Sequence, residues 1–388
     1  MLKKLTSATL HLQMRMIHPK KIMPKKNLAS KIVYSLFKLL FSIEENPSRE
    51  IDPPQKILIV RQHNQLGDLV AGVSLFRALK ETYPQSKITL VVSPFNYPGV
   101  VKNKFLDRIF VFDKKKLFNP VYLFTFIKLL REGYDLAIVP VVVSISFTSN
   151  LLARLSISKI RIGPKSLNGE RNLSEFLFDR RVELDWRKHP DSNVSERSLD
   201  IVRSFSINTT NYRSEITFNG VDTAVAQKFI DDLGIRNEKL LIGLHIGAGK
   251  PTNRWSLDKF ASLVKKIKDS YPSNFYLTGG WAEKDDLNYI IKSVDIKFGK
   301  FINRPIPHIA ALISLSDLFI SNDTGIMHVA GTTDTPQITI FGPTNPFNWA
   351  PIGANKYFIR KSELIDDVSV DDVYHLCDLI LGKREIQK

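Results

Sequence analysis

Acidic, basic and histidine side chains follow several apolar runs in this sequence of 388 residues, where they could act on a bound ligand. The first of them, Asp68, comes after the run KILIV and Gly67, at a point where a helix is expected to begin. A carboxylate placed there can take a proton from an attacking hydroxyl group. The other interpretation of Asp68 is an N-cap, a common role for aspartate at a helix start.

A loop rich in glycine and cations follows a second apolar run, in GLHIGAGKPTNRWSLDKF over residues 243–260. Backbone N–H groups, hydroxyls and cations in such a loop can bind phosphates. The candidate ligand-binding residues are Gly247, Lys250, Thr252 and Arg254. Trp255, at the end of the loop, is interpreted as a packing residue and not as a platform for a sugar ring.

Paired glycines mark a third candidate segment, LTGGWAEKDD, in which Gly279 and Gly280 follow an apolar run. Glycine lets a ligand approach the backbone closely. A single glycine pair after a strand is common, so this signal is weak by itself.

The fourth segment, SNDTGIMHVAG, is the most specific. Asp323, Thr324 and Gly325 open an expected helix, and His328 lies one turn beyond Thr324. A helix start favours an anion, and an aspartate can bind sugar hydroxyls. The alternative is a capping Asp-Thr pair followed by a core histidine.

The elements that position these residues alternate between strand and helix. Four strands and two helices are expected first, and after a polar region over about 160–220 the alternation restarts. The expected strands are 56–60, 88–93, 108–113, 135–142, 240–247, 274–280, 318–321 and 337–342. The expected helices are 70–82, 120–131, about 193–206, 256–270, 282–293, 306–315 and one from about 325.

Such alternation predicts an α/β protein with two Rossmann-like, doubly wound parallel sheets that face a cleft. Ligands of these sheets bind beyond the carboxyl ends of the strands. We expect an N-terminal Rossmann-like domain over 53–215 and a C-terminal Rossmann-like domain over 216–388. The last helix is a candidate to return to the N-terminal domain.

Residues 1–52 form a basic N-terminal extension. Residues 1–43 contain nine Lys or Arg and no Asp or Glu, which is more than half of the net charge of +16. From Leu28 to Ile43 the spacing predicts an amphipathic helix whose narrow polar stripe is Lys31, Ser35, Lys38 and Ser42. Such a helix fits an anionic membrane surface and is too short and too charged to span a bilayer. Packing of the helix on the protein's own core is the alternative.

The chain has one cysteine, Cys377, so one chain cannot form a disulfide framework or a cysteine-based zinc site. A reducing compartment fits this composition. The sequence also has no Asp-x-Asp triplet, a motif whose two carboxylates can hold a metal ion.

Together the four segments resemble glycosyltransferase family 9, the ADP-heptose:lipopolysaccharide heptosyltransferases, from about Lys56 to Pro351. The resemblance rests on IVRQHNQLGDLVAGVSLFRALKETYP, GLHIGAGKPTNRWSLDKFASLV, LTGGWAEKD and ISNDTGIMHVAGTTDTPQITIFGPTNP, which occur in the family's order. It implies a GT-B fold, an inverting mechanism and no metal. It also implies that 53–215 is the acceptor-side domain and that 216–388 is the nucleotide-sugar-binding domain. By position, Asp68 matches the family's proposed general base, and the turn from Asp323 to His328 matches its donor-binding turn.

This sequence departs from the family pattern at two places. The family usually has Lys-Arg-Trp or Lys-His-Trp in the second segment, where the lysine meets the donor phosphate, and this chain has Asn253, Arg254 and Trp255. Lys250 or Arg254 must then replace that lysine, or the donor is held differently. The milder departure is Gly331, where the family has a second alanine.

The resemblance implies transfer of a sugar, heptose from ADP-heptose, to a lipopolysaccharide core or related glycan acceptor. The expected partners are the nucleotide-sugar donor, a lipid-linked acceptor and an anionic membrane surface, with no nucleic acid. No cofactor is expected. The expected location is the cytoplasm, at the inner membrane. The alternatives are a nucleotide-sugar epimerase of similar fold, a non-enzymatic protein that binds membrane or nucleic acid, and an inactive family member.

Overall fold

The computed structural model describes residues 28–234 and 239–385, with side chains described over 34–234 and 239–382. The chain divides into two compact units, Met1–Ser42 and Ile43–Lys388. The described part of the first unit is helix α1 (Leu28–Phe41), which confirms the helix expected there. The cations that precede Leu28 lie outside the described residues. No helix among the described residues is long and apolar enough to cross a bilayer.

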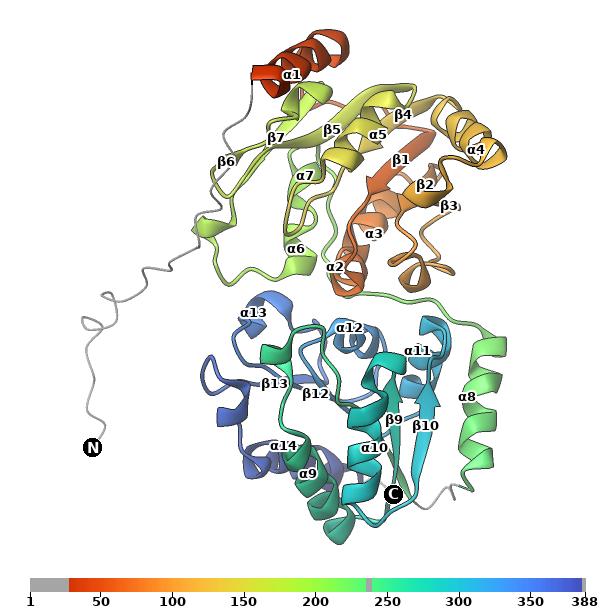
Figure 1. Cartoon of the computed structure of the whole chain (residues 1–388), viewed down its shortest axis with the longest axis vertical. Coiled ribbons are helices and arrows are strands. Elements are labelled where there is room, and N and C mark those ends of the chain that lie inside the picture. Colours follow the sequence, from red (N-terminus) through yellow and green to blue (C-terminus); the bar gives the residue numbers. More distant parts are fainter. Residues whose placement is uncertain (1–27, 235–238, 386–388) are drawn as a thin grey trace, which may run out of the picture. The chain divides into compact units, whose positions relative to one another are not determined.

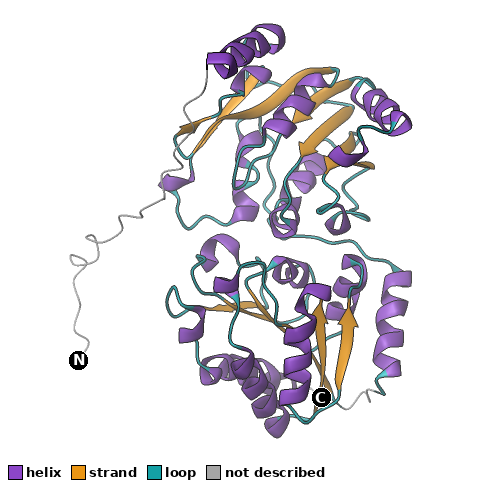
Figure 2. Ribbon diagram, viewed as in Figure 1, coloured by secondary structure: helices purple, strands orange, loops and turns teal. Residues whose placement is uncertain are grey.

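The second unit contains two sheets, and Figures 1 and 2 show that helices cover both faces of each. In the first sheet the strand order is β3-β2-β1-β4-β5, and β5 also pairs with β6 and β7. All pairs are parallel except β5 with β6. The strands are β1 (Lys56–Arg61), β2 (Lys87–Val92), β3 (Arg108–Val111), β4 (Tyr134–Ile138), β5 (Ser158–Leu167), β6 (Glu170–Arg171) and β7 (Arg180–Leu184).

Alternate residues of β1 point into different cores because successive side chains of a strand face opposite sides of its sheet. Ile57 and Ile59 join one core with α2, α3, α6 and α7, whereas Leu58 and Val60 join another with α4 and α5. The helices are α2 (Leu66–Ala71), α3 (Val73–Thr82), α4 (Pro120–Leu130), α5 (Phe147–Leu155), α6 (Val194–Arg197) and α7 (Asp200–Arg203).

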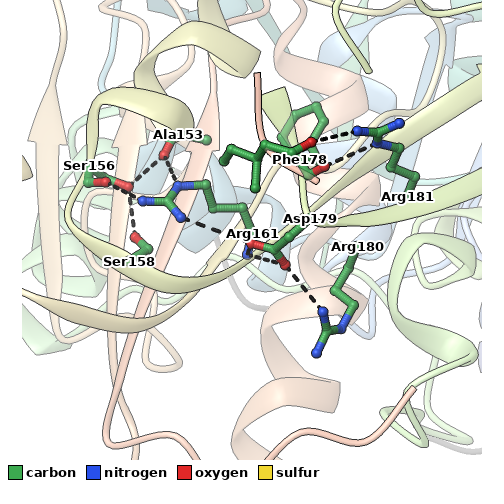
Figure 3. Close-up of polar contacts among 9 residues, drawn as sticks. Ala153, Ser156, Ser158, Arg161, Phe178, Asp179, Arg180 and Arg181 are labelled. Carbon is green, nitrogen blue, oxygen red and sulfur yellow. Dashed lines mark hydrogen bonds and ion pairs between the residues drawn. The ribbon is translucent and has the colours of Figure 1, made fainter. Parts of the chain in front are cut away.

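A cluster of arginines around Asp179 joins β5 to the start of β7 (Figure 3). The Asp179 carboxylate accepts from the backbone N–H of Arg161 at 3.1 and 3.2 Å. The Arg161 side chain donates to the carbonyls of Ala153 and Ser156, at the end of α5. Burial raises the pKa of Asp179, and the two neighbouring arginines oppose that rise. The cluster therefore fixes the edge of the first sheet.

A linker leads to the second sheet and is held by the buried Arg77 of α3. The Arg77 guanidinium donates to the carbonyls of Asn211 and Arg213 at 2.7 and 2.6 Å and to Glu215 at 3.1 Å. Helix α8 (Gly220–Asp232) follows, and its N-cap Asn219 and Asp222 form a capping box.

The second sheet repeats the order of the first, as β10-β9-β8-β11-β12-β13, with every pair parallel. This is the doubly wound order, so the topological switch point lies between β8 and β11, and between β1 and β4 in the first sheet. The strands are β8 (Leu240–His245), β9 (Ser273–Gly279), β10 (Phe298–Ile302), β11 (Leu318–Asn322), β12 (Gln337–Ile340) and β13 (Lys356–Ile359). The expected fold class is confirmed.

Helices also cover both faces of this sheet. One face carries α9, α10 and α14, and the other carries α8, α11 and α12. Their bounds are α9 (Leu257–Ser270), α10 (Lys284–Ser293), α11 (Ile306–Ser314), α12 (Gly325–Gly331) and α14 (Val370–Glu385), and the short α13 is Pro346–Trp349. Within the described residues, α14 buries Val373, Cys377 and Leu381 against the second sheet. The expected return of the last helix to the N-terminal domain is therefore wrong.

Some expected elements differ in extent. The helix expected over 70–82 begins at Leu66 and is interrupted at Gly72, which divides it into α2 and α3. The helix expected over about 193–206 is also two short helices, α6 and α7. The polar region over 160–220 contains β5, β6 and β7, which the sequence analysis missed.

Candidate active site

Asp68 lies in the first turn of α2, after the loop 62–65 that leaves β1 at the switch point. The N-cap of α2 is Gln65, so the N-cap interpretation of Asp68 is wrong. When the Gln65 amide nitrogen faces the carboxylate, it lies 2.6 and 3.2 Å from the two oxygens of Asp68. The residue that precedes the helix therefore orients the carboxylate.

The electrostatic surroundings of Asp68 suit a proton acceptor. Burial raises the pKa of Asp68 to about 6, and the cations Arg61 and Lys250 oppose that rise. Arg61 is itself buried at the end of β1, and burial lowers its pKa. A carboxyl group with a pKa near neutrality combines ionisation at pH 7 with useful basicity.

The first and fourth motifs meet where α2 packs against α12. A Cβ atom on Gly67 would lie 2.6 Å from Cδ2 of His328, so only glycine permits this approach. The His328 ring is buried and lies edge-on to Trp349, with 6.3 Å between ring centroids. Burial lowers the pKa of His328 to about 4, so the ring is neutral at pH 7.

The fourth motif follows β11. Thr324 is the N-cap of α12, but its side chain makes no capping hydrogen bond, and Gly325 lies opposite Leu66 of α2. Burial raises the pKa of Asp323, while a hydrogen bond from Thr344 and the charge of Lys250 oppose the rise. Lys250 thus acts electrostatically on both candidate carboxylates, Asp68 and Asp323.

Asn253, which replaces the family's lysine, binds within the protein. Its amide nitrogen donates to Oδ2 of Asp323 at 2.8 Å. The side chain is buried, and Thr252 donates to its amide oxygen at 3.4 Å. Asn253 therefore holds the Asp323 carboxylate in place.

The two candidate substitutes for the missing lysine have different surroundings. The Arg254 Nε donates to the carbonyl of Ala248 at 2.9 Å, and its guanidinium lies 3.5 Å from Asp286 of α10. Lys250 is exposed, and its charge acts on Asp68 and Asp323. Arg254 therefore has partners within the protein, whereas the charge of the exposed Lys250 acts on the two candidate carboxylates.

Glu283 is a candidate that the sequence analysis missed. Its Oε2 accepts from the N–H of Gly280 at 2.6 Å, and a Cβ on Gly247 would lie 2.7 Å from its Oε1. The carboxylate therefore lies against the loops that follow β8 and β9, beside Gly247, Gly279 and Gly280. The sequence does contain a sign of this role, because Glu283 follows Gly280 by three residues in LTGGWAEKDD. That is the spacing of a capping box, in which Glu283 is the N3 residue.

Asn322, also missed, links the second and fourth motifs. This fully buried side chain donates to the carbonyl of Ile246 at 2.7 Å and accepts from the N–H of Trp255 at 3.2 Å. Trp255 is buried, lies edge-on to Phe260 and donates to the carbonyl of Val368. The interpretation of Trp255 as a packing residue is confirmed.

Metal-ligating side chains do not cluster in the part of the chain that the structure describes: it contains no group of three or more His, Cys, Asp or Glu placed to hold an ion. Independence of metal stays a prediction, because this observation concerns only the protein's own side chains.

Two doubly wound sheets, with motif residues at the ends of β1, β8, β9 and β11, define the GT-B class of fold. A crystal structure of a family 9 glycosyltransferase from Veillonella parvula is similar, with a TM-score of 0.75 and 20% identity over 87% of this chain and all of that one. The structure of Escherichia coli ADP-heptose lps heptosyltransferase II has a TM-score of 0.69 and 18% identity over 85% of this chain and 99% of that one. Both likenesses concern the fold.

The sequence pattern of glycosyltransferase family 9 (heptosyltransferase) matches residues 123–371, and the chain belongs to this family. The chain is 24% identical to lipopolysaccharide heptosyltransferase 3 of Escherichia coli over 306 residues, which cover 74% of this chain and 84% of that protein. It is therefore a glycosyltransferase, and the non-enzymatic alternative is not supported. The family match begins beyond the motif that contains Asp68.

Proposed function

We propose that this glycosyltransferase moves heptose from ADP-heptose to a lipopolysaccharide core or related glycan acceptor, with inversion and without a metal. The observation that carries the mechanism is the placement of Asp68, a buried carboxyl group with a raised pKa, against the turn of the fourth motif. The names of the relatives support the sugar and the acceptor.

In this mechanism Asp68 removes the proton from the attacking acceptor hydroxyl. That oxygen forms a bond to the anomeric carbon while the bond to the diphosphate oxygen breaks, through an oxocarbenium-like transition state. Lys250 compensates the negative charge that develops on the leaving diphosphate. Asp323 and Glu283 offer carboxylate oxygens to hydroxyl groups of the donor.

Turnover of ADP-heptose with and without a lipopolysaccharide core acceptor tests this function. We expect consumption of donor only with acceptor, and this dependence separates a transferase from an epimerase. The activity should persist in EDTA, and loss on chelation would refute metal independence.

Replacement of the proposed base gives a sharper test. Asp68→Asn keeps the shape of the side chain and removes its basicity, so kcat should fall roughly 10²-fold or more. The matched control is Asp269→Asn, the same change at an exposed aspartate near the end of α9. Turnover of Asp68→Asn near that of the wild type, in a folded protein, would contradict the role of Asp68.

The proposed acceptor is held by a lipid, so we also propose that the enzyme associates reversibly with the inner membrane from the cytoplasm. Support comes from α1, in which Leu36, Leu39 and Leu40 are exposed and the neighbouring cations are unopposed by acidic residues. An apolar helix face and a basic arm are the two components of surface binding.

A further inference from the structure

Helix α4 is anchored in the first sheet by its inner face. Phe126 stacks on Phe110 of β3, with 5.1 Å between ring centroids, and also contacts Phe112 at 4.7 Å. Leu129 and Leu130 are buried in the same core. At the other end, the Asn119 side chain caps the helix by accepting from the N–H of Tyr122 at 3.1 Å. The helix therefore has a fixed orientation on the sheet, and its opposite side faces outward (Figure 1).

The outward side of α4 is apolar as well. Phe118, Val121, Phe124 and Ile127 have exposed fractions of 96%, 73%, 69% and 40%, and we call these four residues the α4 outer face. Val121, Phe124 and Ile127 follow one another at spacings of three residues, which makes each the neighbour of the next on the surface of α4. Phe118 lies just before the helix, next to the N-cap Asn119. A helix on the surface of a water-soluble domain normally turns polar residues outward, so an exposed apolar face marks an interaction site.

Cations surround the α4 outer face. The segment from Lys114 to Arg131 contains five Lys or Arg and no acidic residue. Lys114, Lys115 and Lys116 precede Phe118, while Lys128 and Arg131 lie at the other end. Among the described residues, none of these five side chains forms an ion pair. Exposed apolar side chains framed by unpaired cations match an interface between acyl chains and anionic headgroups.

Hydrogen bonds link this surface to the loop that carries the proposed base. The Lys114 ammonium donates to Oγ1 of Thr148 in the first turn of α5, 3.0 Å away. Ser149, the next residue, accepts from the N–H of Gln62 at 2.9 Å. Gln62 begins the loop 62–65 that leads to Asp68. The surface and the acceptor side of the site therefore adjoin the same helix terminus.

We propose that the α4 outer face docks on the surface of a bilayer that contains anionic lipid. Its aromatic and aliphatic side chains enter the headgroup boundary, and Lys114–Lys116, Lys128 and Arg131 bind the headgroups. Docking places the acceptor side of the site at a lipid-held acceptor, and this consequence rests on the proposed function. Docking itself requires no sugar transfer.

A fluorophore on α4 tests the docking in the full chain. Cys377 is the only cysteine and is fully buried, and burial raises the pKa of its thiol, so it competes poorly for a thiol reagent. Val121→Cys is labelled with an environment-sensitive dye, and Val221→Cys on α8, 68% exposed, provides the matched control. Vesicles of phosphatidylglycerol and phosphatidylethanolamine are compared with vesicles of phosphatidylcholine.

With anionic vesicles, we expect the dye at residue 121 to shift to shorter wavelength and to be quenched by a lipid-borne quencher, whereas the dye at residue 221 does neither. No change at residue 121 while the chain sediments with the vesicles would mean binding through α1 alone and would overturn the proposal. A failure of the chain to bind at all would also overturn it. A shift that grows with protein concentration without vesicles would assign the face to a second copy of the chain instead.

A double variant measures the contribution of the face. Phe118→Ser with Phe124→Ser should weaken vesicle binding about tenfold or more, because each exposed aromatic ring loses its transfer into the boundary region. The control, Val221→Ser with Leu364→Ser, removes two apolar side chains elsewhere, each 68% exposed, and should leave binding unchanged. Equal binding by both variants would contradict the docking. Since vesicle binding is measured without turnover, docking by a protein that transfers no heptose would refute only the proposed function.

Discussion

At the scale of single residues, the proposed chemistry depends on how Asp68 is balanced between burial and charge. Burial favours its neutral form, while Arg61 and Lys250 favour the carboxylate. The Gln65 amide adds a donor that fixes the carboxylate without carrying charge. The resulting pKa is about 6. The carboxyl group is therefore mostly ionised at pH 7, and it is a stronger base than the carboxylate of an exposed aspartate.

This balance predicts a pH dependence of activity. Because the base must be deprotonated, kcat/KM should fall about tenfold for each pH unit below about 6. His328, whose pKa is about 4, cannot produce a decline centred near pH 6 because its ring stays mostly neutral down to about pH 4. A pH profile of kcat/KM measures the midpoint, and a decline centred near 4 would be inconsistent with Asp68 as the base.

The same pKa shift predicts a pH dependence of stability. The folded protein retains the Asp68 proton up to about pH 6, whereas the unfolded chain loses it near 3.8. The free energy of unfolding should therefore decrease as the pH rises from about 4 to 6, and Asp68→Asn should remove this contribution. Urea unfolding of both proteins at pH 4 and pH 7 measures it. A larger advantage of the variant at pH 4 than at pH 7 would contradict the sign.

At the scale of elements, the site depends on the close packing of α2 and α12. Gly67→Ala would place a methyl group 2.6 Å from the buried ring of His328, so one of the two helices must move. A displacement near 1 Å in a catalytic constellation can cost about 10²-fold in rate, and we expect a fall in kcat of that order. Gly220→Ala, whose Cβ would meet nothing within 4 Å, is the control. Activity assays should show a lower kcat for Gly67→Ala and an unchanged kcat for Gly220→Ala. Equal activities of the two variants would show that this contact does not position the base.

Two cations in the loop after β8, Lys250 and Arg254, lead to a prediction about donor binding. We expect Arg254→Ala to weaken nucleoside diphosphate binding more than acceptor binding, because the loop belongs to the second sheet. Lys250→Ala should weaken it further, because Arg254 is already held by Ala248 and Asp286. Titration calorimetry with ADP measures both variants. If ADP and acceptor affinities changed equally, the phosphates would bind elsewhere.

At the scale of the whole molecule, positive charge is concentrated at the N-terminus, ahead of the catalytic unit. The catalytic unit begins at Ile43, whose N–H donates to the carbonyl of Phe176 at 2.9 Å. The backbone N–H of Asn46 donates to the carbonyl of Asp179 at 2.7 Å. A shortened chain should therefore begin at Ile43, because a later start would remove these hydrogen bonds. Such a chain separates the contribution of α1 from that of the rest of the protein.

We expect the full chain to sediment with anionic vesicles at low salt and to be released at high salt, since each cation near the surface contributes about 1 kcal/mol before screening. The chain from Ile43 should bind more weakly. A full-length Leu36→Gln, Leu39→Gln and Leu40→Gln variant should weaken binding similarly. The membrane role of α1 fails if the full-length protein and the shortened chain bind equally, and packing of α1 on the core gains support if the shortened chain does not fold.

The sequence by itself determined the two α/β sets and their carboxyl-end motifs, because short apolar runs and helix signals are local properties of the chain. It missed β5 and β7, because Lys159, Arg161 and Arg181 interrupt the apolar pattern of these strands. Arginines in these strands are stabilised by carboxylates and carbonyls that come near them only in the folded chain. Asp179, for example, contacts both the backbone N–H and the guanidinium of Arg161.

Only the tertiary structure decided the contacts that give the motif residues their surroundings. The positions of Asp68 and Asp323 after strands are enough to make them candidates. Their surroundings, however, depend on contacts between segments far apart in sequence. These contacts are the charge of Lys250 on both carboxylates, the hydrogen bond from Asn253 to Asp323, and the close approach of Gly67 to His328. The α4 outer face could not be predicted either. An apolar helix pattern specifies which residues share a side, whereas its exposure depends on which side the rest of the fold covers.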